Sequence, residues 1–299
     1  MGQCLQSLHC SNSSERPPFS SQIALKFPNT INGIRYHDSS WVPVNINQWI
    51  SNLYKSSNCT HWIVYNDDTS SFGNNTKKKG HCKGIISWKE INKDQILISW
   101  LIHSVPNYPR EFNANFISEL EPGELIYGQS FYYMEKLMSI ESCQELISHI
   151  LKMEPNIYIS NFHTGKEKKC DPFIYSLPIT DSVTHILKPP NHEIDIYYHI
   201  ADLVPTSWYI ETWIRGKAIM TPHKNINEIQ LLFYGEIEFY ESQDHSKWAV
   251  SEEHIWIGDL NRMTSQFHRG GGGVLIHDKN IAKAFRSLIK TVSQLKSFT

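Results

Sequence analysis

The chain has 299 residues, of which 40% are hydrophobic and 19% charged, so it carries enough apolar material for a core and is not intrinsically disordered. No apolar run approaches the roughly 18 residues of a membrane-spanning helix, which excludes such a segment. The formal net charge of −2 argues against a permanently basic nucleic-acid binder, but protonation of its 15 histidines in acid would make the chain clearly cationic.

The predicted elements alternate between strands and helices along the whole chain. Residues 1–20 are polar and are interpreted as a loose lead-in. Strands are predicted at 22–27, 61–65, 84–86, 96–105, 157–162, 208–215 and 228–240, and helices at 44–54, 133–153, 193–203 and 281–295. The polar segment 66–79 is predicted to be an exposed loop. This alternation favours a mixed α/β fold with two halves, 21–155 and 156–299, that form one compact unit.

One sequence pattern occurs twice, about half the chain apart. In the first half, Gly80–Gly84 (GHCKG) precedes Trp100–Asn107 (WLIHSVPN), and in the second half Asp244–Trp248 (DHSKW) precedes Trp256–Arg262 (WIGDLNR). Each half therefore offers a His-x-Lys motif, then a strand that begins with tryptophan, then an asparagine. A single His-x-Lys motif carries little information in a chain with 15 histidines, whereas two copies in matched surroundings indicate a shared role.

These two motifs suit the chemistry of a phosphodiester. On a strand, residues two apart point to the same face, so His81 lies with Lys83, and His245 with Lys247. A lysine stabilises the charge that develops on the phosphate oxygens. A neutral histidine can attack phosphorus, and a protonated one can give a proton to the leaving oxygen. Two pairs that face one another would supply both roles without a metal or cofactor.

The sequence resembles the deoxyribonuclease II family of acid endonucleases. The resemblance rests on GHCKG, WLIHSVPNYP (100–109), GQS (128–130), ETW (211–213), DHSKW, GDLNR (258–262) and RGGG (269–272), which follow the family's order over most of the chain. It implies two pseudo-symmetric halves like those of phospholipase D, each a sheet flanked by helices, with one active site at their interface. It also implies metal-independent cleavage of double-stranded DNA in acid that leaves 3′-phosphate ends.

The resemblance also implies roles for individual residues. His81 would be the nucleophile that forms a phosphohistidine and His245 the general acid, with the pair better defined than the order. Lys83 and Lys247 would bind phosphate oxygens. The supporting or phosphate-binding candidates are His103, Asn107, Asp259, Asn261, Arg262 and Arg269.

Several of these residues have structural alternatives that the sequence leaves open. Asp259 would either orient a histidine or end a strand, and Arg262 and Arg269 would meet phosphate or form exposed ion pairs. The glycines at 270–273 would let the backbone approach DNA or form a flexible turn. Trp248 and Trp256 are expected in the core rather than under bases.

The sequence departs from the family in its cysteines and at its start. Ala249 and Ile257 stand where relatives commonly have cysteine, so the family's disulfide pattern is not transferred. The first residues lack a secretory signal pattern, and we expect that the true start is missing, since the resemblance implies a lysosomal or secreted protein. A monomer with an internal pseudo-dimer, no membrane contact and double-stranded DNA as partner complete the expectation.

Two other functions compete with the nuclease. One is a catalytically weak homologue that binds nucleic acid or a host partner, for which the missing cysteines argue mildly. The other is a metal-dependent hydrolase that uses His81, Cys82 and His103. Chelator-resistant nicking of a plasmid at about pH 5 would separate them.

Overall fold

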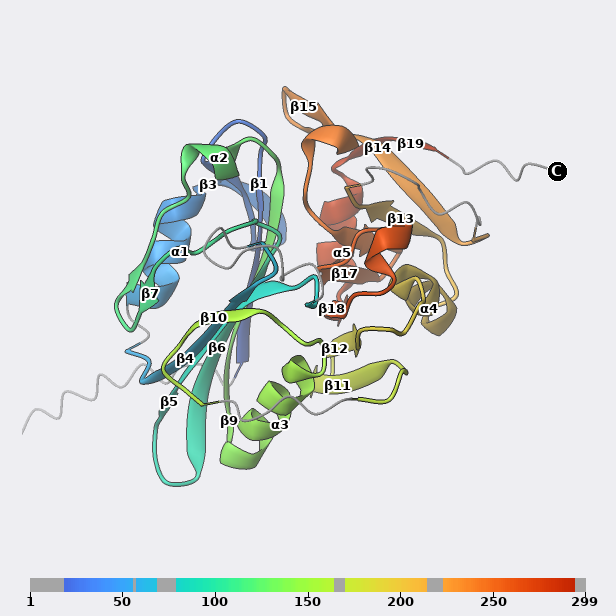
Figure 1. Ribbon diagram of the computed structural model, residues 1–299. Helices are drawn as coiled ribbons and strands as arrows, with labels where there is room; N and C mark the ends of the chain where they lie inside the picture. Colours follow the sequence, from blue (N-terminus) through green and yellow to red (C-terminus); the bar gives the residue numbers. More distant parts are fainter. Residues whose placement is uncertain (1–18, 56–57, 69–78, 164–169, 214–222, 294–299) are drawn as a thin grey trace, which may run out of the picture.

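The computed structural model describes residues 19–55, 58–68, 79–163, 170–213 and 223–293 (Figure 1). These residues form two large sheets with helices around them, which confirms the mixed α/β fold. In sheet order, the first consists of β10 (Ile157–Ser160), β4 (His61–Asn66), β5 (Lys83–Glu90), β6 (Gln95–His103), β9 (Gln129–Ser139), β1 (Phe19–Lys26), β2 (Asn32–His37) and β3 (Ser40–Asn45). The second consists of β11 (Tyr175–Thr180), β12 (Val183–Lys188), β18 (Gly271–His277), β17 (His254–Gly258), β16 (Trp248–Val250), β13 (Trp208–Glu211), β14 (Ile226–Tyr234) and β15 (Ile237–Tyr240), with β19 (Ile289–Ser293) paired to β14.

The five central strands of each sheet follow the same order. The first sheet reads β4-β5-β6-β9-β1 and the second β13-β16-β17-β18-β12, and all these neighbours are antiparallel. In both sets, the strand that comes first in the chain lies fifth in this order, and the other four follow in chain order from the first position to the fourth. The motifs that carry His81 and His245 thus precede topologically matching strands, β5 and β16.

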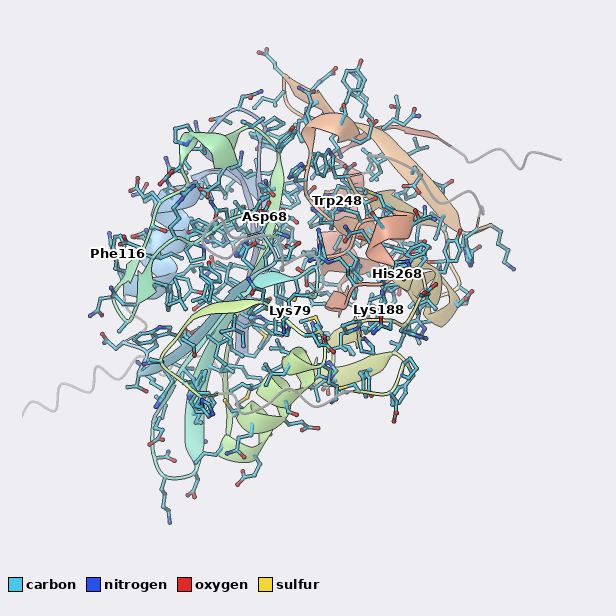
Figure 2. The ribbon with its side chains drawn as sticks, in the orientation of Figure 1. Asp68, Lys79, Phe116, Lys188, Trp248 and His268 are labelled. Carbon is cyan, nitrogen blue, oxygen red and sulfur yellow. The ribbon has the colours of Figure 1, made fainter. Side chains whose placement is uncertain are left out.

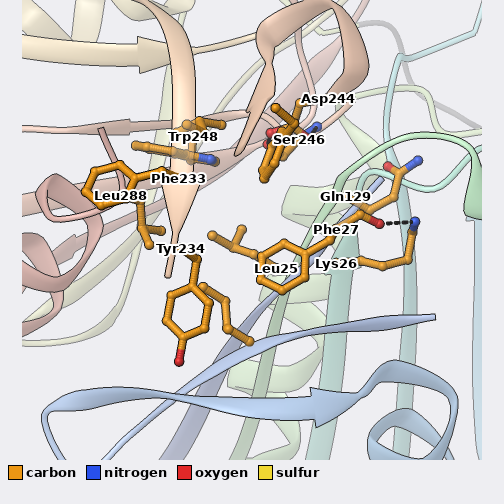
Figure 3. A pocket seen from close by; sticks show the side chains of 13 residues that line it. Leu25, Lys26, Phe27, Gln129, Phe233, Tyr234, Asp244, Ser246, Trp248 and Leu288 are labelled. Atoms are coloured by element: carbon orange, nitrogen blue, oxygen red, sulfur yellow. Dashed lines mark hydrogen bonds between the residues drawn. The ribbon is translucent and has the colours of Figure 1, made fainter. Parts of the chain in front are cut away.

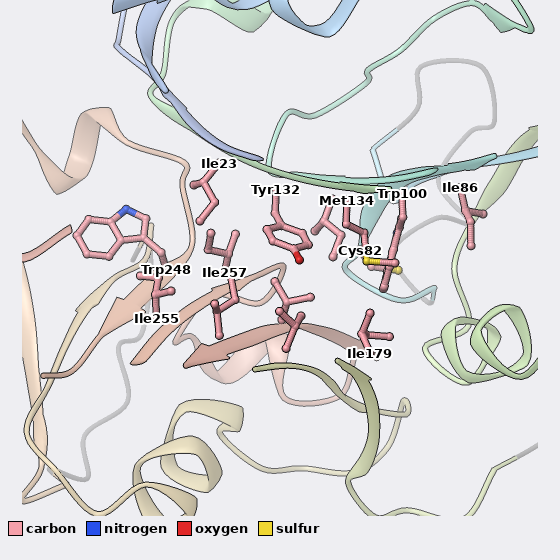
Figure 4. Packing of buried hydrophobic residues seen from close by; sticks show 14 of the residues in the cluster. Ile23, Cys82, Ile86, Trp100, Tyr132, Met134, Ile179, Trp248, Ile255 and Ile257 are labelled. Atoms are coloured by element: carbon pink, nitrogen blue, oxygen red, sulfur yellow. The ribbon is translucent and has the colours of Figure 1, made fainter. Parts of the chain in front are cut away.

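Side chains alternate between two layers on each sheet, as strand geometry requires. Between the sheets, one hydrophobic cluster contains Trp100 and Tyr132 from the first sheet together with Trp248 and Ile257 from the second (Figure 4). On the outer faces, α1 (Ile46–Lys55) covers the first sheet and α4 (Ile196–Leu203) the second. The helices α3 (Ile140–Leu151) and α5 (Lys279–Arg286) contribute to the middle layer, where side chains fill the space between the ribbons (Figure 2).

The remaining elements are short. They are α2 (Pro122–Leu125), the strands β7 (Phe112–Asn113) and β8 (Phe116–Ile117), and the 3₁₀ turns η2 (Glu241–Gln243) and η3 (Thr264–Gln266). The two expected core tryptophans, Trp248 and Trp256, are both fully buried.

Two predicted helices are wrong in part. The segment 133–153 begins as β9, which pairs with β6 and β1, and only from Ile140 does it continue as α3, with Ser139 as its N-cap. The segment 281–295 is helical only to Arg286, because β19 then pairs with β14. The predicted strand 228–240 is a hairpin that turns at Gly235, whose φ is +58°.

Three boundaries also differ from expectation. The lead-in 1–20 lies outside the described residues up to position 18, but β1 begins at Phe19. The predicted second half begins at residue 156, but β10, which follows directly, pairs with β4 and so belongs to the first sheet. Of the predicted strand 208–215, β13 covers 208–211, and positions 214 and 215 lie outside the described residues.

A buried lysine ends each of two topologically matching strands, β1 and β12. At the end of β1, the Lys26 ammonium donates to the carbonyls of Phe27 (2.8 Å, Figure 3), Thr30 and Leu125. At the end of β12, the Lys188 ammonium (labelled in Figure 2) donates to three carbonyls at 2.7–3.1 Å, those of His192, Phe267 and Arg269. Burial lowers the pKa of each lysine to about 8. These hydrogen bonds from the lysine ammonium groups hold the segments that lead into β9 and β18. The candidate site lies beside these segments.

Candidate active site

Each His-Lys motif is hydrogen-bonded to the chain of the opposite sheet. The backbone N–H of His81 donates to the carbonyl of Gly270, just before β18, at 2.7 Å. The N–H of His245 donates to the carbonyl of Gly128, just before β9, at 2.9 Å. The two histidines precede β5 and β16 rather than lying on them, which corrects their expected place on strands. Each motif is thereby fixed against the segment that leads into a strand of the opposite sheet.

His81 is held by contacts from both halves of the chain. Its Nδ1 lies 2.7 Å from the backbone carbonyl of Asp259, and its Nε2 lies 3.7 Å from the carboxylate of Asp67. The histidine is buried, with 8% of its surface exposed. Since a carbonyl only accepts hydrogen bonds, the Nδ1 contact requires a proton on Nδ1. A neutral His81 therefore carries its lone pair on Nε2.

The carboxylate of Asp67 binds the two cationic side chains that lie near His81. Its carboxylate accepts a hydrogen bond from the ammonium of Lys83 and pairs with Arg269, whose Nη1 lies 2.9 Å away. Burial alone would raise the pKa of Asp67, but the charges of His81, Lys83 and Arg269 hold it well below its usual range. The carboxylate therefore stays ionised in acid.

Sequence reasoning missed Asp67 because segment 66–79 was predicted to be an exposed loop. Positions 69–78 lie outside the described residues, but Asn66 and Asp67 are buried. Asn66 ends β4, and its side-chain amide donates to the carbonyls of Val105 and Tyr108. The available signal was that Asp67 directly follows a strongly apolar strand.

The electrostatics of the site favour a neutral His81 in acid. Burial lowers the pKa of His81 well below its usual value, and the charges of Lys83, Arg269 and Lys247 add to this, against the opposing effect of Asp67. Burial, and then the charge of Lys83, lower the pKa of Lys247 to about 7. The lysines of the two motifs thus act on one another, as one shared site requires.

His245 lies in a different environment from His81. Its ring is stacked on Tyr127, with 4.0 Å between centroids and 6° between planes, and it contacts Trp213 at 3.6 Å and 50°. Its carbonyl accepts a hydrogen bond from the Lys247 ammonium. Neither aromatic residue was singled out from the sequence, although both lie within or beside the matched motifs GQS and ETW.

The supporting candidates are placed unevenly. Asp259 joins the site through its carbonyl, and its carboxylate accepts from the N–H of Lys83 at 3.4 Å; burial raises its pKa to about 8. His103 is fully buried beside the rings of Tyr108 and Phe131, and burial lowers its pKa to about 3. It is therefore neutral at pH 5.

The two asparagines differ in exposure. Asn261 is buried, and its Oδ1 has no hydrogen-bond partner among the described residues. Asn107 is partly buried, with a positive φ of 57°.

The two arginines have separate roles. Arg269 joins the site through Asp67 and also donates to the carbonyls of Lys79 and Gly80. Arg262 is fully buried and pairs with Asp195, at 2.9 Å, and with Glu228. Of the two alternatives left open for Arg262, the structure shows ion pairs, but they are buried rather than exposed, and they tie the start of α4 to β14.

The glycine run belongs to a strand, not to a flexible turn. β18 begins at Gly271, and a Cβ at Gly273 would lie 2.3 Å from the carbonyl of Ile257 on the neighbouring strand. Close strand packing therefore requires glycine there.

Cys82, the second residue of the metal-site hypothesis, is part of the core between the sheets (Figure 4). Over the described ranges, no group of three or more His, Cys, Asp or Glu side chains could hold a metal ion. Within the same ranges, no helix is long and apolar enough to cross a membrane.

Comparison with known proteins identifies the family of this chain. The model of the deoxyribonuclease II family matches residues 38–295, so the chain belongs to this family. Cell-death-related nuclease 7 of Caenorhabditis elegans is 27% identical over 85% of this chain and 74% of its own length. Deoxyribonuclease-2 of the same organism is 29% identical over 88% of this chain and 72% of its own length. Deoxyribonuclease-2-alpha of the pig, Sus scrofa, is 26% identical over 80% of this chain and 71% of its own length. The protein is a deoxyribonuclease II-type hydrolase that acts on nucleic acid.

Proposed function

We propose that this protein is an endonuclease that cleaves double-stranded DNA in acid without a metal, through a phosphohistidine, and leaves 3′-phosphate ends. The observation that carries the proposal is a pair of backbone hydrogen bonds, from His81 to Gly270 and from His245 to Gly128, that fix each His-Lys motif against the opposite sheet. One chain thereby supplies both pairs, so a monomer with two pseudo-symmetric halves suffices. By family membership we also propose a lysosomal or secreted location.

In this mechanism His81 is the nucleophile. The contact of its Nδ1 with the Asp259 carbonyl supports a tautomer with the lone pair on Nε2. Burial and the neighbouring cations lower the pKa of His81 and so favour its neutral ring, which is the form able to attack phosphorus. Attack forms the N–P bond and breaks the bond from phosphorus to the 5′-oxygen.

Lys83, Lys247 and Arg269 bind the phosphate oxygens. In the free protein Lys83 and Arg269 pair with the Asp67 carboxylate, which carries one negative charge, as a phosphodiester does. A bound phosphate would therefore share cations that are already gathered at one point. Such preorganised charge stabilises the charge that develops during the transfer.

His245 gives its proton to the leaving 5′-oxygen and afterwards takes a proton from the water that hydrolyses the phosphohistidine. A protonated acid and a neutral nucleophile are required together, so the rate should have a bell-shaped dependence on pH. A rate that stays flat from pH 5 to pH 8 would contradict this mechanism.

Plasmid nicking tests the proposal. Wild-type protein should nick supercoiled DNA at about pH 5 in excess chelator, whereas His81→Ala and His245→Ala should each lose at least roughly 100-fold in rate while keeping a wild-type melting temperature. The product ends should resist extension by terminal transferase until a phosphatase removes the 3′-phosphate. Loss of nicking in chelator, or substantial activity in both variants, would refute the proposed function.

A further inference from the structure

The ring of His245 contacts two aromatic side chains from different parts of the chain, and these two rings also contact each other. Tyr127, beside β9 of the first sheet, lies nearly parallel to the imidazole, with ring centroids 4.0 Å apart. Trp213, just after β13 of the second sheet, contacts the imidazole with 3.6 Å between ring centroids and 50° between ring planes. We refer to Tyr127 and Trp213 as the aromatic clamp.

The backbone fixes the Tyr127 side of the clamp. The N–H of Gly128 donates to the Gln243 carbonyl at 2.9 Å, and the N–H of His245 returns a bond of 2.9 Å to the Gly128 carbonyl. A Cβ at Gly128 would lie 2.4 Å from a carboxylate oxygen of Asp244, so only glycine allows this approach. Tyr127, the preceding residue, is thereby held over the histidine.

The surroundings of the two histidines differ in kind. Asp67 follows β4, the neighbour of β5, and places a carboxylate 3.7 Å from Nε2 of His81. Trp213 follows β13, the neighbour of β16, and places an aromatic ring against His245. The charged groups nearest to His245 in sequence are directed elsewhere: Asp244 bonds Ser246, and the Lys247 ammonium bonds the His245 carbonyl.

Resting on the proposed function, we propose that Tyr127 and Trp213 are positioning residues that hold His245 for proton transfer to the leaving 5′-oxygen. Tyr127 covers one face of the imidazole, and Trp213, whose ring centroid lies 5.5 Å from that of Tyr127, packs against it from another side, so the two contacts together fix the tilt of the ring. Aromatic faces also attract a cation, so they favour the imidazolium that donates the proton. The clamp therefore assigns the acid role to His245 and the nucleophile role to His81.

The step balances as follows. The lone pair of His81 Nε2 forms a bond to phosphorus, the bond to the 5′-oxygen breaks, and its electron pair takes the proton of His245. Water then attacks phosphorus, gives its proton to His245, and the N–P bond pair returns to His81. Only the first transfer depends on the basicity of the leaving oxygen.

Two substrates separate this role from a merely structural one. Thymidine 3′-(p-nitrophenyl phosphate) releases p-nitrophenolate, which needs no proton to leave, whereas the 5′-oxygen in DNA does. Its kcat/KM reports every step up to nitrophenolate release. We expect Tyr127→Ala and Trp213→Ala to lose roughly 10- to 100-fold in kcat/KM on DNA but less than about threefold on the ester, since general-acid catalysis contributes this much or more.

Matched variants complete the experiment. Tyr127→Phe keeps the ring and should keep activity on DNA, and Phe173→Ala, which removes an exposed aromatic residue outside the site, should change neither rate. His245→Ala should retain ester cleavage, and His81→Ala should lose it.

Equal losses on both substrates in the clamp variants would overturn the proposal, as would ester cleavage that survives in His81→Ala but not in His245→Ala. If Tyr127→Ala does not fold, Tyr127→Leu, which fills the space without a π face, must show the same selective loss on DNA. A wild type that cleaves neither DNA nor the ester would instead refute the proposed function itself.

Discussion

At the scale of single residues, one carboxylate sets the charge balance of the site. Asp67 is buried and pairs with Lys83 and Arg269, while it lies 3.7 Å from His81. Without this carboxylate, the buried cations Lys83 and Arg269 would lie beside each other and beside the imidazole of His81, with no negative charge to compensate them. Removing one partner of a buried ion pair is costly because the remaining charge stays desolvated.

We therefore predict that Asp67→Asn lowers the free energy of unfolding by about 3 kcal/mol. The folded-state pKa of Asp67 is depressed, so its contribution is fully present above the unfolded value near 3.8 and is lost only as the pH falls through the folded value. The loss should consequently be equal at pH 5 and pH 7. Denaturant unfolding at both values measures it, with the exposed neighbour Asp68→Asn as control. A loss confined to pH 7 would contradict this account.

Lys247 is the second residue whose charge follows the working pH. Because burial and the charge of Lys83 lower its pKa to about 7, the ammonium is formed at pH 5 and largely lost at pH 8. Other groups titrate in the same range, so a rate alone does not isolate it, whereas binding to a noncleaving variant does.

We compare how much affinity for a duplex oligonucleotide His81→Ala and the double variant His81→Ala/Lys247→Arg each lose between pH 6 and pH 8. We predict that the loss is roughly tenfold greater for His81→Ala, because its charge-assisted contact from Lys247 disappears. Arginine stays protonated over the whole range. Fluorescence anisotropy at constant ionic strength provides the measurement. Identical pH dependence in the two proteins would show that Lys247 does not bind phosphate through its charge.

At the scale of elements, the contact between the start of β9 and the segment before β16 joins the two sheets at the site. Gly128 and Asp244 form an isolated parallel bridge there. A Cβ at Gly128 would overlap Asp244, with 2.9 Å even to its carboxyl carbon. The bridge therefore fixes His245 relative to the first sheet.

Gly128→Ala should accordingly reduce DNA cleavage by roughly 10- to 100-fold, since small displacements of catalytic groups have effects of this size, and should cost about 1–3 kcal/mol of stability through overpacking. Gly123→Ala is the matched control, because a Cβ there meets nothing within 4 Å. Plasmid nicking and thermal melting of both variants give the comparison. Unchanged cleavage by Gly128→Ala would mean that the close approach is not needed.

The elements also show how far sequence predicts this structure. Strands such as β4 and β6 were found because their apolar pattern is local. β9 was mistaken for the start of a helix because its strand form depends on pairing with β6 and β1, about 30 and 110 residues away in the chain, which local periodicity does not report.

The site divides in the same way. The repeated motif identified His81 and His245. Asp67 lies in no motif, and Tyr127 and Trp213, beside GQS and within ETW, show their contacts with His245 only in the tertiary structure. The burial of the Arg262 ion pairs was not predicted, because their acidic partners, Asp195 and Glu228, come from distant segments.

At the scale of the whole molecule, a buried histidine pair links the two halves. His149 of α3 and His185 of β12 have ring centroids 5.1 Å apart, and His185 also contacts Trp100 of β6. Burial, and then the charge of Lys152, lower the pKa of His149 to about 4, and burial lowers that of His185 well below its usual value. The His149 ring is thus mostly neutral in the folded protein at pH 5, whereas it is mostly protonated in the unfolded chain, and the pKa of His185 is shifted in the same direction.

This difference makes the whole fold less stable in acid, where the enzyme is proposed to work. A depressed histidine pKa means that the unfolded state binds more protons between pH 4 and pH 6.5, so stability falls as the pH falls through this window. For His149 the loss between pH 7 and pH 5 is about 2 kcal/mol. His149→Leu, which keeps an apolar side chain at this buried position, should therefore reduce the pH 7-to-5 difference in unfolding free energy by about 1–2 kcal/mol.

Guanidinium unfolding at the two pH values tests this, and the exposed His163→Leu should leave the wild-type difference unchanged. If His149→Leu keeps the full difference, the acid sensitivity of the fold arises elsewhere. If it removes the difference, the junction between α3 and β12 limits how far into acid the two halves, and with them the two His-Lys motifs, stay together.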